Sequence, residues 1–166
     1  MSTHHAEVRW TAGADEDFLA GRYSRKHRLR FGALTVEGSA APSVVPAPWS
    51  TPDAVDPEAA FVASLSACHM LWFLDLARRA GVEVRGYVDA PTGELGRNAE
   101  GRMAMTRVRL RPRVDCDADA TTLADLHHRA HEACFIANSV RTEIMIDPDP
   151  AHLHVQVQPS VRQPAT

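Results

Sequence analysis

A long apolar segment between Asp56 and Gly81 limits what this chain can fold into more than any other feature. Asp56, Pro57 and Glu58 form a helix start, because Asp suits the N-cap, Pro the first turn and Glu the positive end of the helix dipole. Gly81 is a typical helix stop, so the pattern predicts a helix over residues 57–80. The segment's longest apolar run, residues 59–74, is short for a membrane span and polar in places. Because its apolar side chains lie on nearly all faces, we expect a central helix buried by sheet or by a partner subunit.

The rest of the pattern predicts an α+β domain in which strands alternate with two helices. Four prolines between residues 40 and 56 exclude helix and central strand, which leaves an extended connection there. The apolar phase of residues 102–114 changes near Thr106, which predicts a β-bulge. The predicted strands cover residues 6–11, 23–31, 34–38, 82–89, 102–114, 140–146 and 153–157, with a hairpin turn at Gly32, turns over residues 91–101 and a second helix over residues 119–138. The tail after residue 159 is expected to fray.

The composition fits one globular domain over residues 1–166, since a chain of 166 residues with 45% hydrophobic side chains can bury a single core. A net charge of -3 argues against a generic nucleic-acid-binding surface. The N-terminus has no secretory signal pattern. We therefore expect a cytoplasmic protein that is not bound to membranes and whose three cysteines are reduced.

Two of the three cysteines lie inside the predicted helices, and two interpretations of them are open. Cys68 and Cys134 fit small buried hydrophobic residues, which is where free cysteine often occurs. If the two helices pack together, the thiols can instead form a nucleophile and a resolving partner that close a disulfide after oxidation. Cys116 lies in an acidic loop whose carboxylates disfavour a thiolate, so we expect an incidental residue and a poor nucleophile.

Histidines close to these cysteines allow a third interpretation, a structural zinc site. Cys68, His131 and Cys134 are suitable ligand types, although only His131 and Cys134 share a helix face. His69 fits a hydrogen-bonded helix histidine. Three histidines are expected on the solvated or interface side of the second helix: His127, His128 and His131.

The N-terminal strands are rich in arginine, which matters because a thiolate in an apolar pocket needs a nearby cation. Such an arginine needs a carboxylate to hold it. The same arginines also fit the solvated face of an edge strand, and the residue pattern leaves both interpretations open. The candidates are Arg22, Arg25, Arg28 and Arg30.

Two segments carry a resemblance that covers nearly the whole chain. DPEAAFVASLSACHMLWFL resembles the first-cysteine helix of the OsmC/Ohr family, the osmotically inducible protein C and organic hydroperoxide resistance proteins, with Pro57, Glu58 and Cys68 at the family spacing. AHEACFIANSV resembles the second-cysteine helix of the OsmC-like branch. Phe135 stands where the family often has proline, and the connection before Pro57 is long and rich in proline.

The resemblance implies an intertwined homodimer in which two long central helices are wrapped by antiparallel sheets. It also implies an antioxidant enzyme of the oxidative stress response that reduces organic hydroperoxides, and hydrogen peroxide less well, without metal or other cofactor. Cys68 would be the peroxidatic nucleophile and Cys134 the resolving thiol, reset by a dithiol such as a lipoylated protein. An apolar pocket near them would favour bulky organic peroxides.

By the same resemblance, Glu58 would hold the active-site arginine, which aligns best with Arg25 and less well with Arg22 or Arg28. Glu58 and Cys68 are ten residues apart, about 15 Å along a straight helix. Either the helix is interrupted, or the Glu58 and Cys68 of one site come from different subunits of an antiparallel dimer.

Three other functions compete with the peroxidase. The first is a non-catalytic redox-sensing or ligand-binding protein of the same fold. The second is the zinc-bound structural domain described above. The third is acyl transfer or hydrolysis through Cys68, which no Cys-His-Asn order in the chain supports.

Overall fold

The computed structural model describes residues 1–149, so the strand predicted over residues 153–157 and the frayed tail lie outside the described residues. The described residues form an α+β structure with two α-helices and three small sheets. They fall into two compact units, residues 1–63 and the residues from Ser64 onward. The assignment of residues 1–166 to one domain stays a prediction.

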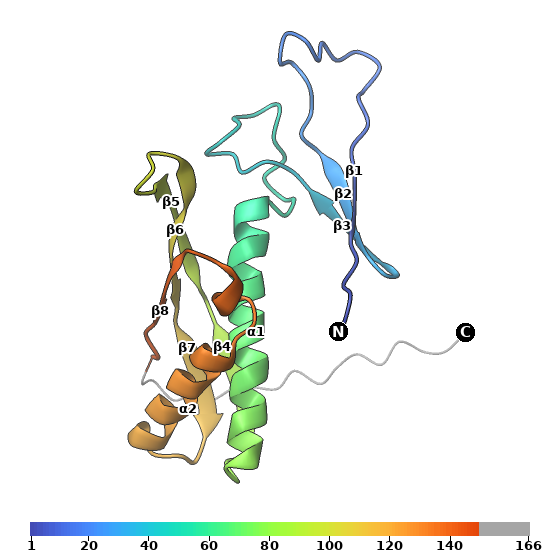
Figure 1. The fold of residues 1–166 in the computed structure, drawn as a ribbon. Helices are drawn as coiled ribbons and strands as arrows, with labels where there is room; N and C mark the ends of the chain where they lie inside the picture. Colours follow the sequence, from blue (N-terminus) through green and yellow to red (C-terminus); the bar gives the residue numbers. More distant parts are fainter. Residues whose placement is uncertain (150–166) are drawn as a thin grey trace, which may run out of the picture. The chain divides into compact units, whose positions relative to one another are not determined.

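The first unit is built on an antiparallel sheet in the order β1-β2-β3 (Figure 1). Its strands are β1 (Glu7–Arg9), β2 (His27–Phe31) and β3 (Leu34–Gly38). The predicted hairpin is confirmed, because Phe31 pairs with Leu34 and Gly32 between them has a φ of +61°, a conformation that favours glycine. β2 begins later than predicted, because the preceding residues form a loop in which Asp17 bridges to Arg22.

The proline-rich connection over residues 39–56 contains no helix or strand, as predicted. Backbone and side-chain hydrogen bonds tie it to the sheet. Val55 forms a bridge with Gly38 at the end of β3. The fully buried hydroxyl of Ser39 accepts a hydrogen bond from the Thr51 backbone N–H at 2.9 Å.

The helix α1 (Pro57–Arg79) matches the predicted helix to within one residue. The Asp56 carboxylate accepts the Ala59 backbone N–H at 2.7 Å, which confirms it as the residue that begins the helix. Gly81 has a φ of +76°, and the N–H of Val82 returns to the carbonyl of Ala77 at 2.9 Å. This is the hydrogen-bond pattern of a glycine-terminated helix.

Only one face of α1 is buried within the described chain, so the expectation of burial on all sides is not met there. The buried residues follow a spacing of three and four: Val62, Leu65, His69, Phe73 and Ala77. Leu71, on another face, is 63% exposed. α1 is long and apolar enough by composition to cross a membrane, and 22% of the apolar window is buried. A helix whose apolar faces are packed against other helices or sheets in a protein core has the same composition.

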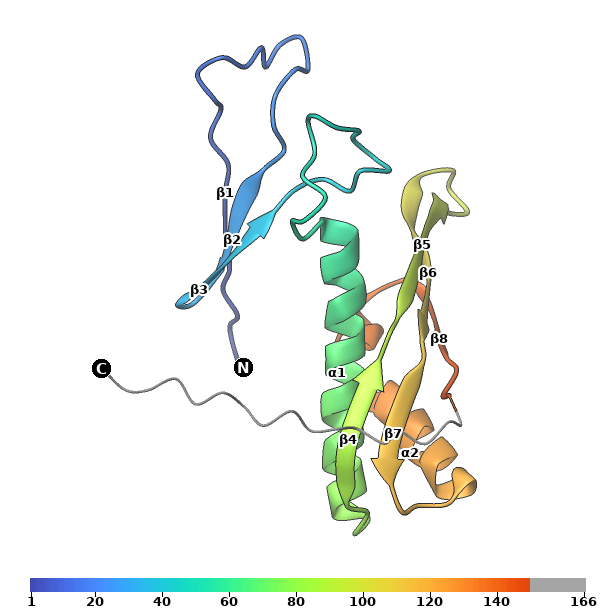
Figure 2. The ribbon, with the colours of Figure 1, turned by 180° about the vertical axis from the view of Figure 1, so that it is seen from behind.

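The second unit contains the remaining two sheets and the helix α2 (Ala120–Ala133). One sheet pairs β4 (Val84–Asp89) with β7 (Pro112–Cys116). The other pairs β6 (Met103–Leu110) with the antiparallel β5 (Thr92–Arg97) and the parallel β8 (Glu143–Ile146). α2 lies in front of β4 and β7 in Figure 1 and behind them in Figure 2, so it covers one face of that sheet.

The β5–β6 pairing corrects one prediction and confirms another. Residues 92–97 form a strand where a turn was predicted, because their glycines and the preceding proline weaken the sequence signal for a strand. Glu94 pairs with Arg107 and Leu95 with Met105, which leaves Thr106 as the extra residue of the predicted bulge. The single strand predicted over residues 102–114 is divided after Leu110, and its two parts belong to different sheets.

α2 is shorter than predicted, because the polar side chains after it hydrogen-bond to carbonyls at and just beyond its end and favour a turn. Asn138 donates to the Glu132 carbonyl at 2.8 Å, and Ser139 donates to the Phe135 carbonyl at 2.7 Å. A short 3₁₀ turn, Ala137–Ser139, follows. Cys134 therefore lies at the C-cap in an extended conformation, with φ −66° and ψ 112°, and not inside a helix as predicted.

The core of the second unit joins α1, α2 and β7. Its buried residues are Phe73, Ala77, Val114, Cys116, Leu126 and Ala130. Cys116 is the last residue of β7 and 6% exposed, so its assignment to an acidic loop is wrong. The alternation of buried and less buried residues along β7 places it inward with Val114.

Two histidines are also part of this interior. His69 of α1 and His127 of α2 are 1% and 3% exposed, and the Nε2 of His69 lies 3.0 Å from the Nδ1 of His127. The expectation that His127 faces solvent is wrong, because it lies one turn from the partly buried Leu123 and the buried Ala130 and stacks on Phe73. Burial lowers the pKa of His69 to about 3 and that of His127 to about 4.

We predict that acid destabilises the protein through this histidine pair. Both folded-state pKa values lie below the ordinary value of 6.5, so the unfolded chain binds more protons below that pH. The free energy of unfolding should fall as the pH drops from 6.5 toward 4, by about 2 kcal/mol per histidine at pH 5. Urea unfolding at pH 7 and pH 5 measures the change.

The double variant His69→Leu, His127→Leu should lose most of this pH dependence, whatever its absolute stability. His128→Asn is the matched control, because His128 is an exposed histidine of the same helix. An unchanged slope of stability against pH in the double variant would contradict the assignment.

Candidate active site

The cysteines Cys68 and Cys134 come together where the end of α2 meets the middle of α1. Both views show this part of the chain beside α1 (Figures 1 and 2). The side chains of Cys134 and Cys68 are close enough to interact, and Cys68 helps to raise the pKa of the Cys134 thiol. Both cysteines are free thiols, with Cys68 partly exposed and Cys134 buried. The predicted meeting of the two helices therefore brings together a reachable thiol and a sheltered one.

The Cys134 thiol is held in its protonated form. It is 1% exposed, and its sulfur accepts a hydrogen bond from the Ala137 backbone N–H at 3.4 Å. Burial, and next the interaction with Cys68, raises the pKa of Cys134 to about 11. Cys134 therefore keeps its proton at neutral pH.

An apolar groove of about 530 Å³ opens beside Cys68. Besides Cys68, its wall includes Leu71 and Trp72 of α1 and Phe135 and Ile136 beyond α2. The rings of Trp72 and Phe135 meet edge to face at 5.3 Å, and Phe135 is 68% exposed. This groove can receive an apolar organic group next to a thiol.

The candidate arginines have different surroundings in the first unit. Arg22 pairs with Asp17, and Arg28 is exposed. Arg25 is less exposed, and its guanidinium lies 3.7 Å above the centre of the Tyr23 ring. Its Nη1 donates to the carbonyls of Gly21 at 3.0 Å and of Tyr23. Of the three, Arg25 has the most contacts around its guanidinium, and its Nη2 forms no bond within residues 1–149.

The tyrosine beneath Arg25 belongs to a cluster of aromatic rings. Trp10, Phe18 and Tyr23 lie with ring centres 4.7 to 5.7 Å apart. The Arg25 backbone N–H also donates to the Trp49 carbonyl at 2.8 Å. Sequence patterns did not predict this cluster, because its members are separated by a loop.

Glu58 does not pair with a candidate arginine within residues 1–149, where Arg22 pairs with Asp17 and Arg25 with backbone carbonyls. α1 is continuous from Pro57 to Arg79, which excludes an interruption between Glu58 and Cys68. The two residues are therefore separated by about 15 Å along one helix. One site cannot use both from the same chain at close range.

No three histidine, cysteine or acidic side chains in residues 1–149 lie close enough together to hold a metal ion. His69 and His127, which the sequence did not predict as a pair, bond to each other beside the cysteine-bearing turn of α1. The sequence held a signal for this pair, since His69 is adjacent to Cys68 and His127 lies on the apolar stripe of the second helix between Leu123 and Ala130.

Comparison with known proteins identifies the family to which this chain belongs. The family model for OsmC-like protein matches residues 50–149, and the chain belongs to this family. An OsmC-like protein of unknown function from Vibrio cholerae is 44% identical, with a TM-score of 0.86 over 90% of this chain and 100% of that chain.

Two organic hydroperoxide resistance proteins share the fold at lower identity. The Elizabethkingia anophelis protein is 18% identical, with a TM-score of 0.67 over 89% of this chain and 94% of that chain. OhrB of Bacillus subtilis is also 18% identical, with a TM-score of 0.66 over 89% and 98% of the two chains. No curated protein sequence matches the chain.

Proposed function

We propose that the protein is a cysteine-based peroxidase that reduces organic hydroperoxides, and hydrogen peroxide more weakly, in the cytoplasm. One observation carries the proposal: the partly exposed Cys68 thiol lines an apolar groove beside the buried, protonated thiol of Cys134. Family membership and the shared fold of organic hydroperoxide resistance proteins support it. The groove supplies a surface for the organic part of the substrate.

The first step oxidises Cys68. Its thiolate attacks the terminal oxygen of the hydroperoxide, and the O–O bond breaks as the S–O bond forms. Cys68 becomes a sulfenic acid, and the alkoxide leaves and takes up a proton to become an alcohol. Cys134 remains protonated during this step, so it does not compete for the peroxide.

The second step oxidises Cys134 and forms a disulfide that an external dithiol can reduce. Its sulfur attacks the sulfenic sulfur of Cys68, an S–S bond forms, and the hydroxyl leaves with the thiol proton as water. An external dithiol, such as a lipoylated protein, then exchanges with the disulfide and is itself oxidised. Each cycle consumes one hydroperoxide and one dithiol, without metal or other cofactor.

Arg25 is the residue we assign to activate this chemistry. Its charge would stabilise the Cys68 thiolate and its free Nη2 would orient the peroxide. Stacking on Tyr23 and bonds to two carbonyls support the assignment, since they fix the guanidinium in advance. Glu58 would hold the same arginine through a charged hydrogen bond.

The working form we propose is an intertwined homodimer. The uncovered apolar surface of α1, including Leu71, supports it, because a partner helix would remove that surface from water. The unbroken length of α1 supports an arrangement in which each site combines Cys68 of one subunit with Glu58 of the other.

Cysteine variants separate the two thiol roles. Cys68→Ser should lower hydroperoxide consumption by more than about a thousandfold, because the nucleophile is gone. Cys134→Ser should still consume one hydroperoxide per chain and then stop, because the sulfenic acid has no resolving thiol. Thiol-coupled consumption of cumene hydroperoxide measures both, with Cys116→Ser as the matched control that retains turnover.

Multiple turnovers by Cys68→Ser would contradict the assignment of the nucleophile. Rapid oxidation of the wild type followed by negligible turnover with any dithiol would favour the competing function, a redox sensor of the same fold.

A mixed dimer tests whether the site is shared. Glu58→Gln and Cys68→Ser homodimers should each be impaired. After subunit exchange, the mixed dimer should regain activity at one of its two sites, because that site combines an intact Cys68 with an intact Glu58 from the other subunit. Turnover is measured before and after mixing.

The control for exchange is a mixture of Cys68→Ser with the double variant Glu58→Gln, Cys68→Ser, which has no intact nucleophile. Absence of recovery in mixed dimers whose formation is verified by native mass spectrometry would contradict a shared site.

A further inference from the structure

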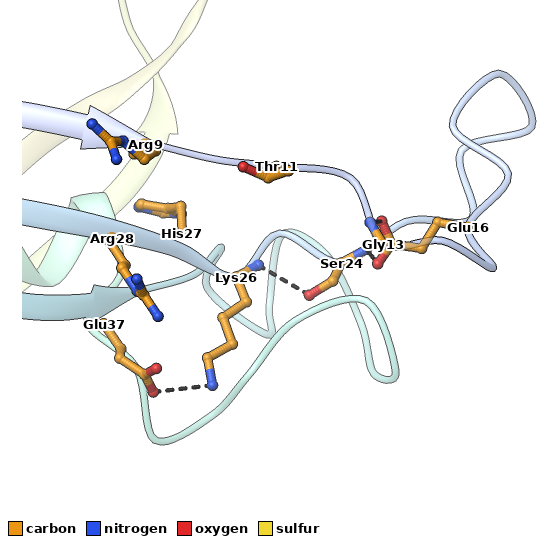
Figure 3. Close-up of a pocket in the computed structure, with 9 residues that line it drawn as sticks. All are labelled: Arg9, Thr11, Gly13, Glu16, Ser24, Lys26, His27, Arg28 and Glu37. Carbon is orange, nitrogen blue, oxygen red and sulfur yellow. Dashed lines mark hydrogen bonds and ion pairs between the residues drawn. The ribbon is translucent and has the colours of Figure 1, made fainter.

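A second pocket lies in the first unit and is not used by the proposed peroxidase. It has a volume of about 440 Å³ beside the β1–β3 sheet (Figure 3). Its charged and titratable lining residues are Arg9, Lys26, His27, Arg28, Glu16 and Glu37. The balance of charge around this pocket points to an anionic ligand.

Two arginines of the pocket stand directly opposite each other. Arg9 on β1 pairs with Arg28 on β2, so their side chains leave the same face of the sheet. Like charges in this arrangement destabilise a strand pair. Glu37 stands opposite Arg28 on β3, but its carboxylate forms an ion pair with the Lys26 Nζ at 3.1 Å, as Figure 3 shows. Within residues 1–149, the Arg28 guanidinium has no hydrogen-bond or ion-pair partner.

The carboxylate nearest to Arg9 is that of Glu7, which also pairs with a second arginine. Glu7 pairs with Arg9 at 2.9 Å and with Arg30 at 2.8 Å. Three arginines on β1 and β2 therefore have one carboxylate between them, since Lys26 and Glu37 neutralise each other. The pocket lining itself carries Arg9, Lys26 and Arg28 against Glu16 and Glu37, which leaves a net charge of one positive.

Other contacts fix the shape of the pocket. The Glu16 carboxylate accepts the backbone N–H groups of Gly13 and Ser24, each at 2.9 Å, which closes the neighbouring loop and lowers the pKa of Glu16. His27 Nδ1 donates to the Arg25 carbonyl at 2.8 Å. The His27 ring lies on Gly38, where an added Cβ would collide with it. The wall is therefore preformed: Glu37 is paired with Lys26, and the negatively charged Glu16 is held by backbone N–H groups.

We infer that this pocket binds a dianionic phosphoryl group between Arg9 and Arg28, either as free phosphate or as part of a small phosphate monoester. The lining has a net positive charge and two facing arginines, and guanidinium groups bind phosphate oxygens through paired hydrogen bonds. Binding would relieve the repulsion between the opposed arginines. The pocket volume leaves room for an organic group beyond the phosphate.

The test is calorimetric titration of the full chain with inorganic phosphate, glycerol phosphate and acetate at constant ionic strength and pH 7.5. The wild type should bind both phosphates and not acetate. Tighter binding of glycerol phosphate would identify a phosphate monoester as the ligand, and equal binding would identify free phosphate. Arg28→Gln and Arg9→Gln should each weaken phosphate binding by about tenfold, because each removes a charged donor.

Arg102→Gln is the matched control, because Arg102 is an exposed arginine of the other unit. It should bind phosphate as the wild type does, and phosphate should raise the melting temperature of both but not that of Arg28→Gln. Equal binding of acetate and phosphate by the wild type, or equal weakening in Arg102→Gln, would overturn the proposal. The readout is independent of peroxidase activity, so either proposal can fail alone.

Discussion

The interaction between the thiols of Cys134 and Cys68 is the one on which the account of this molecule depends. It exists because α2 stops at Ala133 and the chain turns inward, which buries Cys134 beside α1. One thiol is thereby left partly exposed in an apolar groove, and the other is kept protonated. The position at which α2 ends therefore gives the two thiols different chemical properties.

Local sequence signals were enough to predict the elements whose ends are set by residues adjacent in the sequence. Asp56 and Gly81 define α1, and the change of apolar phase at Thr106 marks the bulge. β5 was missed because its glycines carry little strand signal and its stability comes from pairing with β6. The end of α2 was missed for a similar reason, since side chains beyond it hydrogen-bond to carbonyls at and just after its last turn.

The cysteine pair was predictable from two helical segments and the family resemblance, but its surroundings were not. His127 is buried because it meets His69 across two helices, a contact that no local pattern contains. The position of Arg25 also depends on contacts with Tyr23, which is close in the sequence, and with Trp49, which is distant. One chain leaves part of the apolar surface of α1 uncovered, which is consistent with a site completed by a second subunit.

A single-turnover oxidation tests the central claim most directly. Reduced protein is mixed with one equivalent of cumene hydroperoxide, the loss of thiols is followed in time, and the new bond is located by mass spectrometry. The account predicts rapid loss of two thiols and a bond between Cys68 and Cys134, with Cys116 still reduced. Intact thiols after this treatment, or a bond that includes Cys116, would contradict it.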